Sequence, residues 1–183
     1  MDFGKVLKKI TGEFVKNKIK YALIGGYALG LYGVVRSTAD LDFLIAKDQA
    51  GLLKILLKKY LYAIVYESEN VIQFEHPTGV FGSLDFLYAF RPVSLEMLIR
   101  APKKKIFGGE IVVPVALPED IIGLKIQAMH NDPGRLTLDM EDIKGLMAAN
   151  AKGMDWKIIK AHFEMFGRVG LFEELKNEYF PQK

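Results

Sequence analysis

Two aspartates interrupt an otherwise apolar segment at residues 38–46, TADLDFLIA, and their spacing limits how this segment can fold. In an extended strand, alternate side chains share a face and their Cα atoms lie about 6.5 to 7 Å apart. Asp40, Asp42 and Leu44 therefore share one face, and the intervening apolar side chains share the other. Ionised carboxylates at this distance repel each other, and burying either one unpaired is costly. The segment is predicted to be a strand whose acidic face meets cations or hydrogen-bond donors.

A later apolar segment carries the same four letters and a third carboxylate. Residues 82–89, GSLDFLYA, repeat the LDFL of residues 41–44 and place Asp85 in a second predicted strand. If these strands are neighbours with aligned faces, Asp40, Asp42 and Asp85 converge on one site. Carboxylate oxygens suit Mg²⁺, which completes its shell with water and substrate phosphates. Two such ions about 3.5 to 4 Å apart can activate an attacking oxygen and stabilise leaving pyrophosphate.

A glycine pair lies between a predicted strand and a predicted helix. Gly25 and Gly26 follow the apolar run at residues 21–24 and precede a small-residue helical pattern that ends at Gly33. A plain turn is one interpretation, since glycine commonly separates elements. Because the two aspartates follow, we favour a phosphate-binding turn in which backbone N–H groups approach a phosphate chain.

The hydrophobic pattern divides the chain into a mixed α/β part and a helical part. Residues 1–116 combine helical periodicity with short apolar runs separated by glycine and proline, and Asp48 is predicted to cap one of the helices. Residues 117–183 show helical periodicity throughout. We therefore predict a core domain at 1–116 and a C-terminal helical region at 117–183 that packs on it. The helical patterns lie at 3–17, 26–33, 48–60, 93–101, 118–131, 136–150, 155–167 and 171–180, and the strand patterns at 21–25, 38–46, 61–67, 70–75 and 80–89. Residues 103–116 are predicted to form a hairpin with its turn at Gly108 and Gly109.

Composition excludes several classes of site. The 183 residues are half apolar, enough for a sizeable core, and contain no cysteine, so disulfides, thiolate metal sites and cysteine nucleophiles are excluded. His76, His130 and His162 show no ligand spacing. The net charge of +3 permits a phosphate-rich partner without indicating one. No apolar run is long enough for a membrane span, and the start of the chain is amphipathic, so we expect a cytoplasmic protein without membrane contact.

The order of these motifs resembles the nucleotidyltransferase superfamily. A strand, the glycine pair, a helix, the run Arg36-x-Thr38-x-Asp40-x-Asp42 and Asp85 on a later strand match its pattern of hG[G/S], [D/E]h[D/E] and a third carboxylate. The resemblance covers about residues 20–90. It implies an α/β (α+β) fold with a mixed β-sheet and flanking helices.

The resemblance also implies roles for these residues. The three acids would bind two Mg²⁺ ions, with Mn²⁺ as an alternative, and Asp85 would also help to deprotonate the attacking hydroxyl. Gly25, Gly26, Arg36 and Thr38 would hold a nucleoside triphosphate. Two interpretations of Arg36 stay open, a solvated loop cation and a ligand of triphosphate oxygens.

The C-terminal part is similar to the helical segment of the AbiEii-like nucleotidyltransferases, a group that includes toxins of type IV toxin–antitoxin pairs. Residues 116–129, ALPEDIIGLKIQAM, and 134–146, GRLTLDMEDIKGL, follow the group's pattern of a helix lysine, an arginine and K-D-x-x-D-I. The matching residues are Lys125, Arg135, Asp139, Asp142 and Ile143, whereas Leu138 stands where the pattern has a lysine.

This second resemblance implies that Lys125 and Arg135 bind the triphosphate. Asp139 and Asp142 are interpreted as supporting residues that pair with Arg135, with Lys125 or with backbone donors, and an orienting or base role is the alternative. For Lys125 alone, a solvated position on an amphipathic helix is the competing interpretation.

Together the residues and the resemblance predict a transferase that moves a nucleoside monophosphate from a nucleoside triphosphate to a hydroxyl. By resemblance the acceptor is RNA, such as the 3′ end of a transfer RNA, and the chain is a toxin with a cognate antitoxin. Within enzymes, the alternative acceptor is a protein or a small molecule such as an aminoglycoside. Outside enzymes, the alternative is a catalytically silent nucleotide- or RNA-binding module. The complete acidic triad argues against silence, while Leu138 favours altered chemistry.

Overall fold

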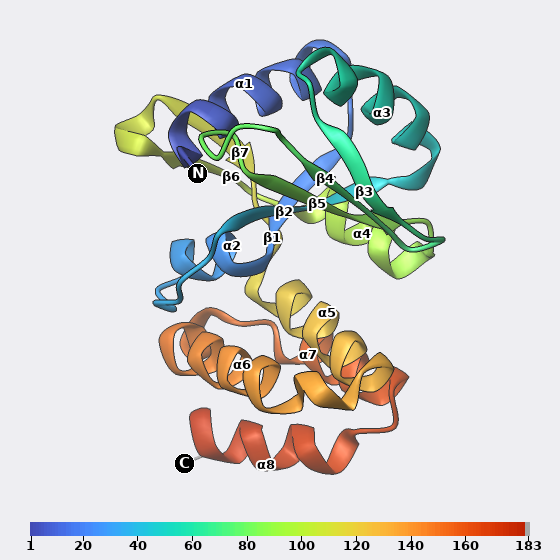
Figure 1. Ribbon diagram of the computed structural model, residues 1–183. Coiled ribbons are helices and arrows are strands. Elements are labelled where there is room, and N and C mark those ends of the chain that lie inside the picture. Colours follow the sequence, from blue (N-terminus) through green and yellow to red (C-terminus); the bar gives the residue numbers. More distant parts are fainter. Residues whose placement is uncertain (182–183) are drawn as a thin grey trace. The chain divides into compact units, whose positions relative to one another are not determined.

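The computed structural model describes residues 1–181 and divides into two compact units (Figure 1). Unit 1 comprises residues 1–28 and 37–116. Unit 2 comprises residues 29–36 and the described chain from Leu117 onward. The predicted α/β class is confirmed, because unit 1 combines a mixed sheet with helices and unit 2 is helical.

Unit 1 contains a five-stranded mixed sheet with the order β1-β2-β5-β4-β3. Strands β2 and β5 pair in parallel, and the other neighbours pair antiparallel. This order makes the two aspartate-bearing segments neighbours, which is the condition under which their acids were expected to converge. The strands are β1 Tyr21–Ile24, β2 Asp40–Ala46, β3 Ala63–Glu67, β4 Val71–Glu75 and β5 Ser83–Ala89.

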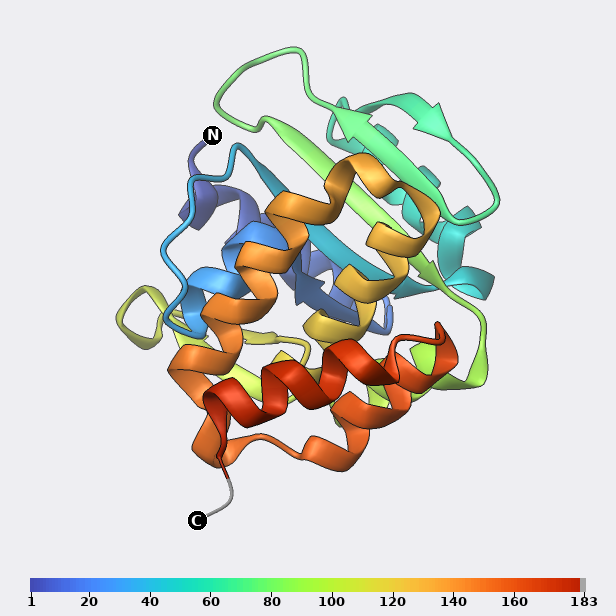
Figure 2. The ribbon, with the colours of Figure 1, turned by 90° about the horizontal axis from the view of Figure 1, so that it is seen from below.

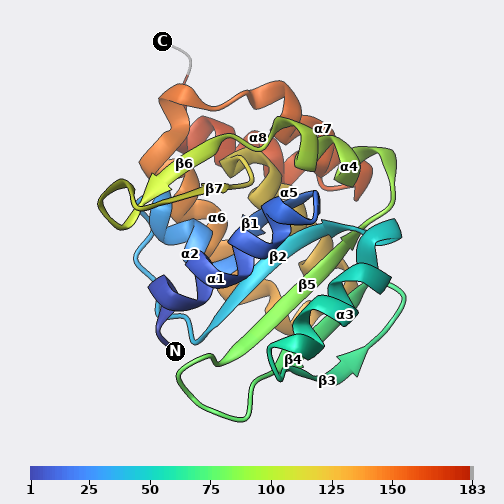
Figure 3. The same ribbon diagram turned by 90° about the horizontal axis from the view of Figure 1, so that it is seen from above.

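Helices cover the sheet of unit 1, and a separate hairpin follows it. Helices α1 and α3 lie over one face, and α4 lies on the other side of the sheet (Figures 1 and 3). The helices are α1 Phe3–Lys16, α2 Gly25–Leu31, which continues into unit 2, α3 Ala50–Lys59 and α4 Pro92–Arg100; the hairpin strands are β6 Lys103–Ile106 and β7 Ile111–Pro114, and short 3₁₀ turns span Lys47–Gln49 and Phe107–Gly109.

The core of unit 1 lies between its sheet and α1. Phe14 of α1 makes edge contacts with Phe43 on β2 and Phe86 on β5, at ring-centroid distances of 5.8 and 6.1 Å. Phe43 and Phe86 stack on each other at 5.3 Å. These rings occupy the apolar positions that alternate with the aspartates. Burying one face of β2 and β5 under α1 therefore directs the carboxylates to the opposite face.

The predicted cap at Asp48 is wrong. Asp48 lies in the 3₁₀ turn Lys47–Gln49, and α3 begins only at Ala50, with Gln49 at the cap position. The side chain of Gln49 instead bonds to the backbone that precedes β1. It accepts a hydrogen bond from the Lys20 N–H at 2.7 Å and donates to the Lys18 carbonyl at 3.1 Å. The tight turn at the end of β2 thus moves the helix start past the aspartate.

Unit 2 is built from four helices and the short segment at residues 29–36. Helix α5 packs against α6 and α7, and α8 packs against α7 and α6 (Figures 1 and 2). The Asn150 side chain donates to the Tyr32 carbonyl at 3.0 Å, which joins the short segment to α6. No helix among residues 1–181 combines the length and apolar character needed to cross a membrane. The helices are α5 Pro118–Asn131, α6 Leu136–Asn150, α7 Trp156–Met165 and α8 Val169–Tyr179, with 3₁₀ turns at Pro133–Arg135 and Ala151–Gly153.

Candidate active site

Three carboxylates of unit 1 converge on one face of the sheet. In the parallel pairing of β2 with β5, Asp42 lies opposite Asp85, and Asp40 lies two residues earlier, opposite Ser83. One oxygen from each acid lies within 4.8 Å of the others, and all three side chains are partly buried. The convergence predicted from alternation in the two strands is therefore present. Three hard oxygen donors in this arrangement can bind a divalent cation.

Two of these acids accept hydrogen bonds from neutral side chains. The Thr38 hydroxyl donates to Asp40 Oδ1 at 2.9 Å, and Gln73 Nε2 donates to Asp85 Oδ2 at 2.9 Å. A neutral donor orients a carboxylate without cancelling its charge, so the acids keep their attraction for a cation. Gln73 is not among the residues expected from the sequence. Its polar side chain between two buried apolar positions was the available signal, but only the pairing of β4 with β5 shows which residue it faces.

The environment of Asp85 favours a bound positive charge. Burial raises the pKa of Asp85, the hydrogen bond from Gln73 partly opposes this, and the negative charges of Asp40 and Glu75 raise the pKa further. Within residues 1–181, no arginine or lysine opposes these effects at Asp85. A divalent cation would relieve the repulsion between the acids.

The glycine pair makes room for the acidic site. Gly25 has a φ of +65°, and a Cβ atom there would lie 1.9 Å from Asp42 Oδ2. A Cβ atom at Gly26 would lie 2.8 Å from Cβ of Thr38. The pair is therefore more than a plain turn, because any side chain would displace residues of the site. Helix α2 has only seven residues, and binding of phosphate by this turn stays a prediction.

The residues of the site fit the divalent ions implied by the resemblance. Asp40, Asp42 and Asp85 supply only carboxylate oxygens, the ligand type that Mg²⁺ and Mn²⁺ prefer. Because Gly25 has no side chain, the space beside Asp42 is not filled. Thr38 and Gln73 donate hydrogen bonds to two of the acids, as the outer partners of metal ligands do.

A second group of sequence-predicted residues forms an ionic cluster within unit 2. Lys125 Nζ donates to Asp139 Oδ1 at 2.9 Å and also to Asp142, and Arg36 donates to Asp142. Arg135 Nε donates to Asp139 Oδ2 at 2.9 Å. The expected pairing of the two aspartates with Lys125 and Arg135 is thus present. Lys125 is only 7% exposed, so the alternative of a solvated helix face is wrong.

Opposing effects act on the pKa of Asp139 in this cluster. Burial acts to raise the pKa of Asp139, but hydrogen bonds from Arg135 and Lys125 outweigh it, so this pKa lies below its ordinary value. Arg36, Lys125 and Arg135 together contact the two carboxylates of Asp139 and Asp142. Arg36 is half-buried, and its partner Asp142 makes it more than a solvated loop cation.

A protein-family model described as "Nucleotidyl transferase AbiEii toxin, Type IV TA system" matches residues 12–183. This chain belongs to the AbiEii nucleotidyltransferase family. It is a nucleotidyltransferase, and the resemblance found in its motifs is confirmed. A comparison with curated protein sequences found no match.

Solved structures show the same fold as this AbiEii-family chain. The antibiotic-resistance factor ANT(2″)-Ia is 18% identical with a TM-score of 0.64, covering 97% of this chain and 100% of its own. A nucleotidyltransferase-like protein from Paracoccidioides brasiliensis is 19% identical with a TM-score of 0.57, covering 99% and 97%. The lincosamide adenylyltransferase LnuA is 18% identical with a TM-score of 0.55, covering 79% and 96%. At these identities the likeness concerns the fold.

The departure from the AbiEii-like pattern at Leu138 lies on the surface of unit 2. Leu138 is 44% exposed on α6, while its neighbour Asp139 is fully buried. The missing lysine therefore removes a surface charge without disturbing the buried pairs of Asp139.

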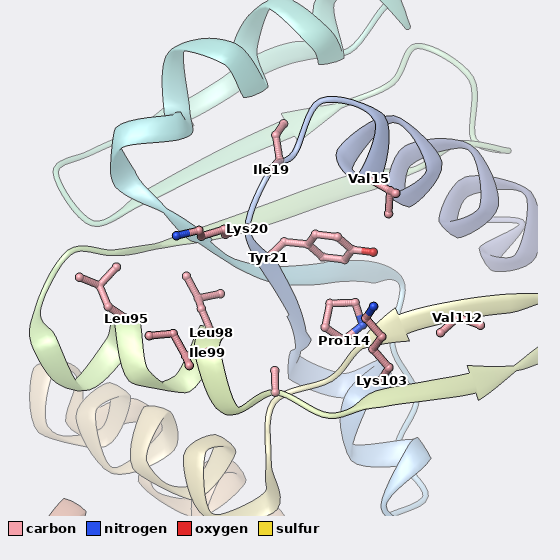
Figure 4. Close-up of a pocket in the computed structure, with 11 residues that line it drawn as sticks. Val15, Ile19, Lys20, Tyr21, Leu95, Leu98, Ile99, Lys103, Val112 and Pro114 are labelled. Carbon is pink, nitrogen blue, oxygen red and sulfur yellow. The ribbon is translucent and has the colours of Figure 1, made fainter.

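A second feature of unit 1 lies apart from the acids. A cavity of about 720 Å³ opens between the end of α1, β1, α4 and the β6–β7 hairpin (Figure 4). Its walls are mainly aliphatic, and Lys20 and Lys103 are its charged lining residues. None of the three acids lines this cavity. The cavity is therefore separate from the candidate active site.

Proposed function

We propose that this nucleotidyltransferase moves a nucleoside monophosphate from a nucleoside triphosphate to a hydroxyl group, with Mg²⁺ or Mn²⁺ held by Asp40, Asp42 and Asp85. The observation that carries the proposal is the convergence of their three oxygens within 4.8 Å beside a glycine that leaves room for them. Two ions suit the charge of three carboxylates and a triphosphate. When bound, such ions stabilise charge on the reacting phosphate and on the leaving pyrophosphate.

The acids of the chain also provide a base. The acceptor oxygen bonds to the α-phosphorus while the bond from this phosphorus to the bridging oxygen breaks, and pyrophosphate leaves. We assign the proton of the acceptor hydroxyl to Asp85 Oδ2, which keeps a second lone pair beside the hydrogen bond from Gln73, while Oδ1 faces the cation.

The nucleotide is proposed to contact Gly25, Gly26 and Thr38 in unit 1. The two glycines expose backbone where a side chain is sterically excluded, which suits close approach by a phosphate. Arg36, Lys125 and Arg135 of unit 2 are also proposed ligands of the triphosphate. Their support is the geometry of the cluster, in which Asp139 and Asp142 orient these cations.

For the acceptor, we propose RNA, with a toxin role restrained by an antitoxin protein in the cytoplasm. The family description, which names a toxin of a type IV toxin–antitoxin system, supports this choice. A small-molecule hydroxyl is the second candidate, since ANT(2″)-Ia has been crystallised with adenylyl-2″-tobramycin. That likeness concerns the fold alone, so RNA takes precedence. A silent nucleotide-binding module would bind triphosphate without transferring label.

Label transfer tests the proposal. Wild type, Asp42→Ala and the control Asp48→Ala are incubated with each α-labelled triphosphate, Mg²⁺ and either total RNA, total protein or aminoglycosides. Because metal binding supplies several kcal/mol of transition-state stabilisation, Asp42→Ala is expected to lower labelling by at least about 100-fold. Asp48 is exposed in a 3₁₀ turn, so its variant should keep wild-type activity. Circular dichroism confirms that each variant is folded.

Each outcome assigns the acceptor or rejects the site. Label that nuclease removes and protease does not identifies RNA, whereas label on protein or on an aminoglycoside overturns the RNA assignment. Wild-type labelling by Asp42→Ala would reject the acidic site. Triphosphate binding without transfer to any acceptor would favour the silent module. Growth arrest on expression of wild type but not of Asp42→Ala would support the toxin role.

A further inference from the structure

We propose that Gln73 is a positioning residue for Asp85: its side-chain amide holds Asp85 Oδ2 so that Asp85 Oδ1 is presented to the divalent cation. This inference rests on the proposed function, because it assigns Asp85 as a metal ligand. It adds a residue that neither the motif nor the family resemblance indicates.

The sheet register brings the two side chains together. Gln73 on β4 lies directly opposite Asp85 on β5, and Asp85 in turn lies opposite Asp42 on β2. The three residues therefore form one row across a single face of the sheet. Gln73 Nε2 donates to Asp85 Oδ2 at 2.9 Å, a normal distance for a hydrogen bond. Both side chains are partly buried, so water competes less for the bond than at a fully exposed site.

The chemistry of glutamine suits this position. An arginine or lysine opposite Asp85 would form an ion pair and cancel the charge that attracts a metal. An acidic residue would add repulsion and could not donate when ionised. The glutamine amide donates without carrying charge, so it restricts the rotation of Asp85 and leaves the carboxylate negative. Glu75, the next residue on the same face of β4, offers only acceptor oxygens and raises the pKa of Asp85.

The same arrangement occurs at a second acid of the site. The Thr38 hydroxyl donates to Asp40 Oδ1, so Asp40 also has one oxygen held by a neutral donor. Outer hydrogen bonds of this kind orient metal ligands, and their loss typically lowers metal affinity by about 10- to 100-fold. Without Gln73, the carboxylate of Asp85 can rotate away from Asp40. This rotation relieves the repulsion between the two acids and lowers the affinity of the site for metal. Gln73 therefore acts through the geometry of Asp85.

Metal titration of the full chain tests this role. Binding of Mn²⁺ to wild type, Gln73→Leu, Glu75→Gln and Asp42→Ala is followed by electron paramagnetic resonance, with Mn²⁺ alone and with a non-hydrolysable triphosphate analogue. Leucine keeps the bulk of residue 73 but cannot donate, so its Kd for Mn²⁺ should rise about 10- to 100-fold. Glu75→Gln, on the same face of the same strand, removes a charge but not the donor. Its Kd should change by less than about 3-fold, since exposed charges are screened.

Activity and stability separate positioning from a merely structural role. In label transfer, Gln73→Leu should require more Mg²⁺ for half-maximal rate, and saturating Mg²⁺ should restore most of kcat. Urea unfolding in EDTA should place Gln73→Leu close to wild type. A Kd for Mn²⁺ within 2-fold of wild type, or a loss of kcat that excess metal leaves unchanged, would overturn the inference.

The failure of the two proposals can be told apart. If wild type and Asp42→Ala bind Mn²⁺ equally weakly, the metal site and the role of Gln73 are both wrong. If metal binding depends on Asp42 and Gln73 but no acceptor is labelled, the positioning role stands and the transferase proposal fails.

Discussion

Gly25 shows most directly how one residue constrains the site. It combines a φ of +65°, which disfavours any residue with a Cβ atom, with a close approach to the side chain of Asp42. Conformation and contact therefore select glycine independently at the same position. Gly26 is selected by contact with Thr38 alone.

Gly25→Ala should damage both the site and the fold. The added methyl group must displace Asp42, so label transfer should fall by at least about 10-fold. Mutating the outer partner of a metal ligand typically causes a loss of this size. Because alanine is strained in the left-handed backbone conformation at this position, the substitution should also lower the free energy of unfolding by about 1 to 3 kcal/mol. Urea unfolding and label transfer measure the two effects.

Gly12→Ala is the matched control in the same unit. Gly12 lies inside α1, and nothing approaches within 4 Å of its added Cβ atom. Alanine should therefore stabilise α1 by about 0.5 to 1 kcal/mol and leave label transfer unchanged. Full activity of Gly25→Ala would show that Asp42 can move without loss.

At the scale of elements, helices α5 and α6 are joined by the buried contacts of Lys125. Lys125 is on α5, and its two carboxylate partners are on α6. Removing one member of a buried ionic group leaves the remaining charges uncompensated. The cluster therefore contributes to the packing of unit 2 whatever its role toward a nucleotide.

Lys125→Met should destabilise unit 2 by about 3 to 5 kcal/mol, the range for breaking a buried ion pair. The exposed Lys144 on α6 supplies the control, since Lys144→Met should change stability by less than about 0.5 kcal/mol. Trp156 is the single tryptophan of the chain and lies in unit 2, so its fluorescence in urea reports unfolding of this unit. Equal stabilities of the two variants would contradict a structural role for the cluster.

At the scale of the whole molecule, the buried acids link stability to pH. The pKa of Asp139 is lower in the folded protein than its ordinary value of 3.8. Ionised Asp139 therefore adds stability at pH values above its unfolded pKa. This contribution is lost as the pH falls through the lower folded value.

As the pH falls, the free energy of unfolding should decrease more steeply for wild type than for Asp139→Asn. Between pH 6 and pH 3, one such proton changes the free energy of unfolding by at most about 1.4 kcal/mol per pH unit. Asparagine cannot take up this proton, so the free energy of unfolding of the variant should depend less on pH. Urea unfolding followed by Trp156 fluorescence at several pH values measures the slopes. A variant with the wild-type slope would show that Asp139 contributes nothing to the pH dependence.

The sequence by itself determined the local geometry of the acids and the order of the elements. Asp40 and Asp42 share a face because strand side chains alternate, whichever strand lies alongside. The helical periodicity from residue 118 onward likewise predicted α5 to α8. The cap at Asp48 failed because the turn after β2 and the contacts of Gln49 moved the start of α3.

Only the tertiary structure decided which distant residues meet. The register of β4 against β5 sets Gln73 opposite Asp85, and no local pattern encodes that register. Lys125 is buried where α5 meets α6, and its partners there lie 14 and 17 residues further along the chain. Arg36 contacts Asp142, which is 106 residues away in the sequence. The direction of a side chain depends on the backbone within a few residues, whereas its partner depends on packing across the chain. The three acids and the pairing of Asp139 and Asp142 with Lys125 and Arg135 could therefore be found from sequence. Gln73 as the donor to Asp85 and Arg36 as a partner of Asp142 could be identified only after folding.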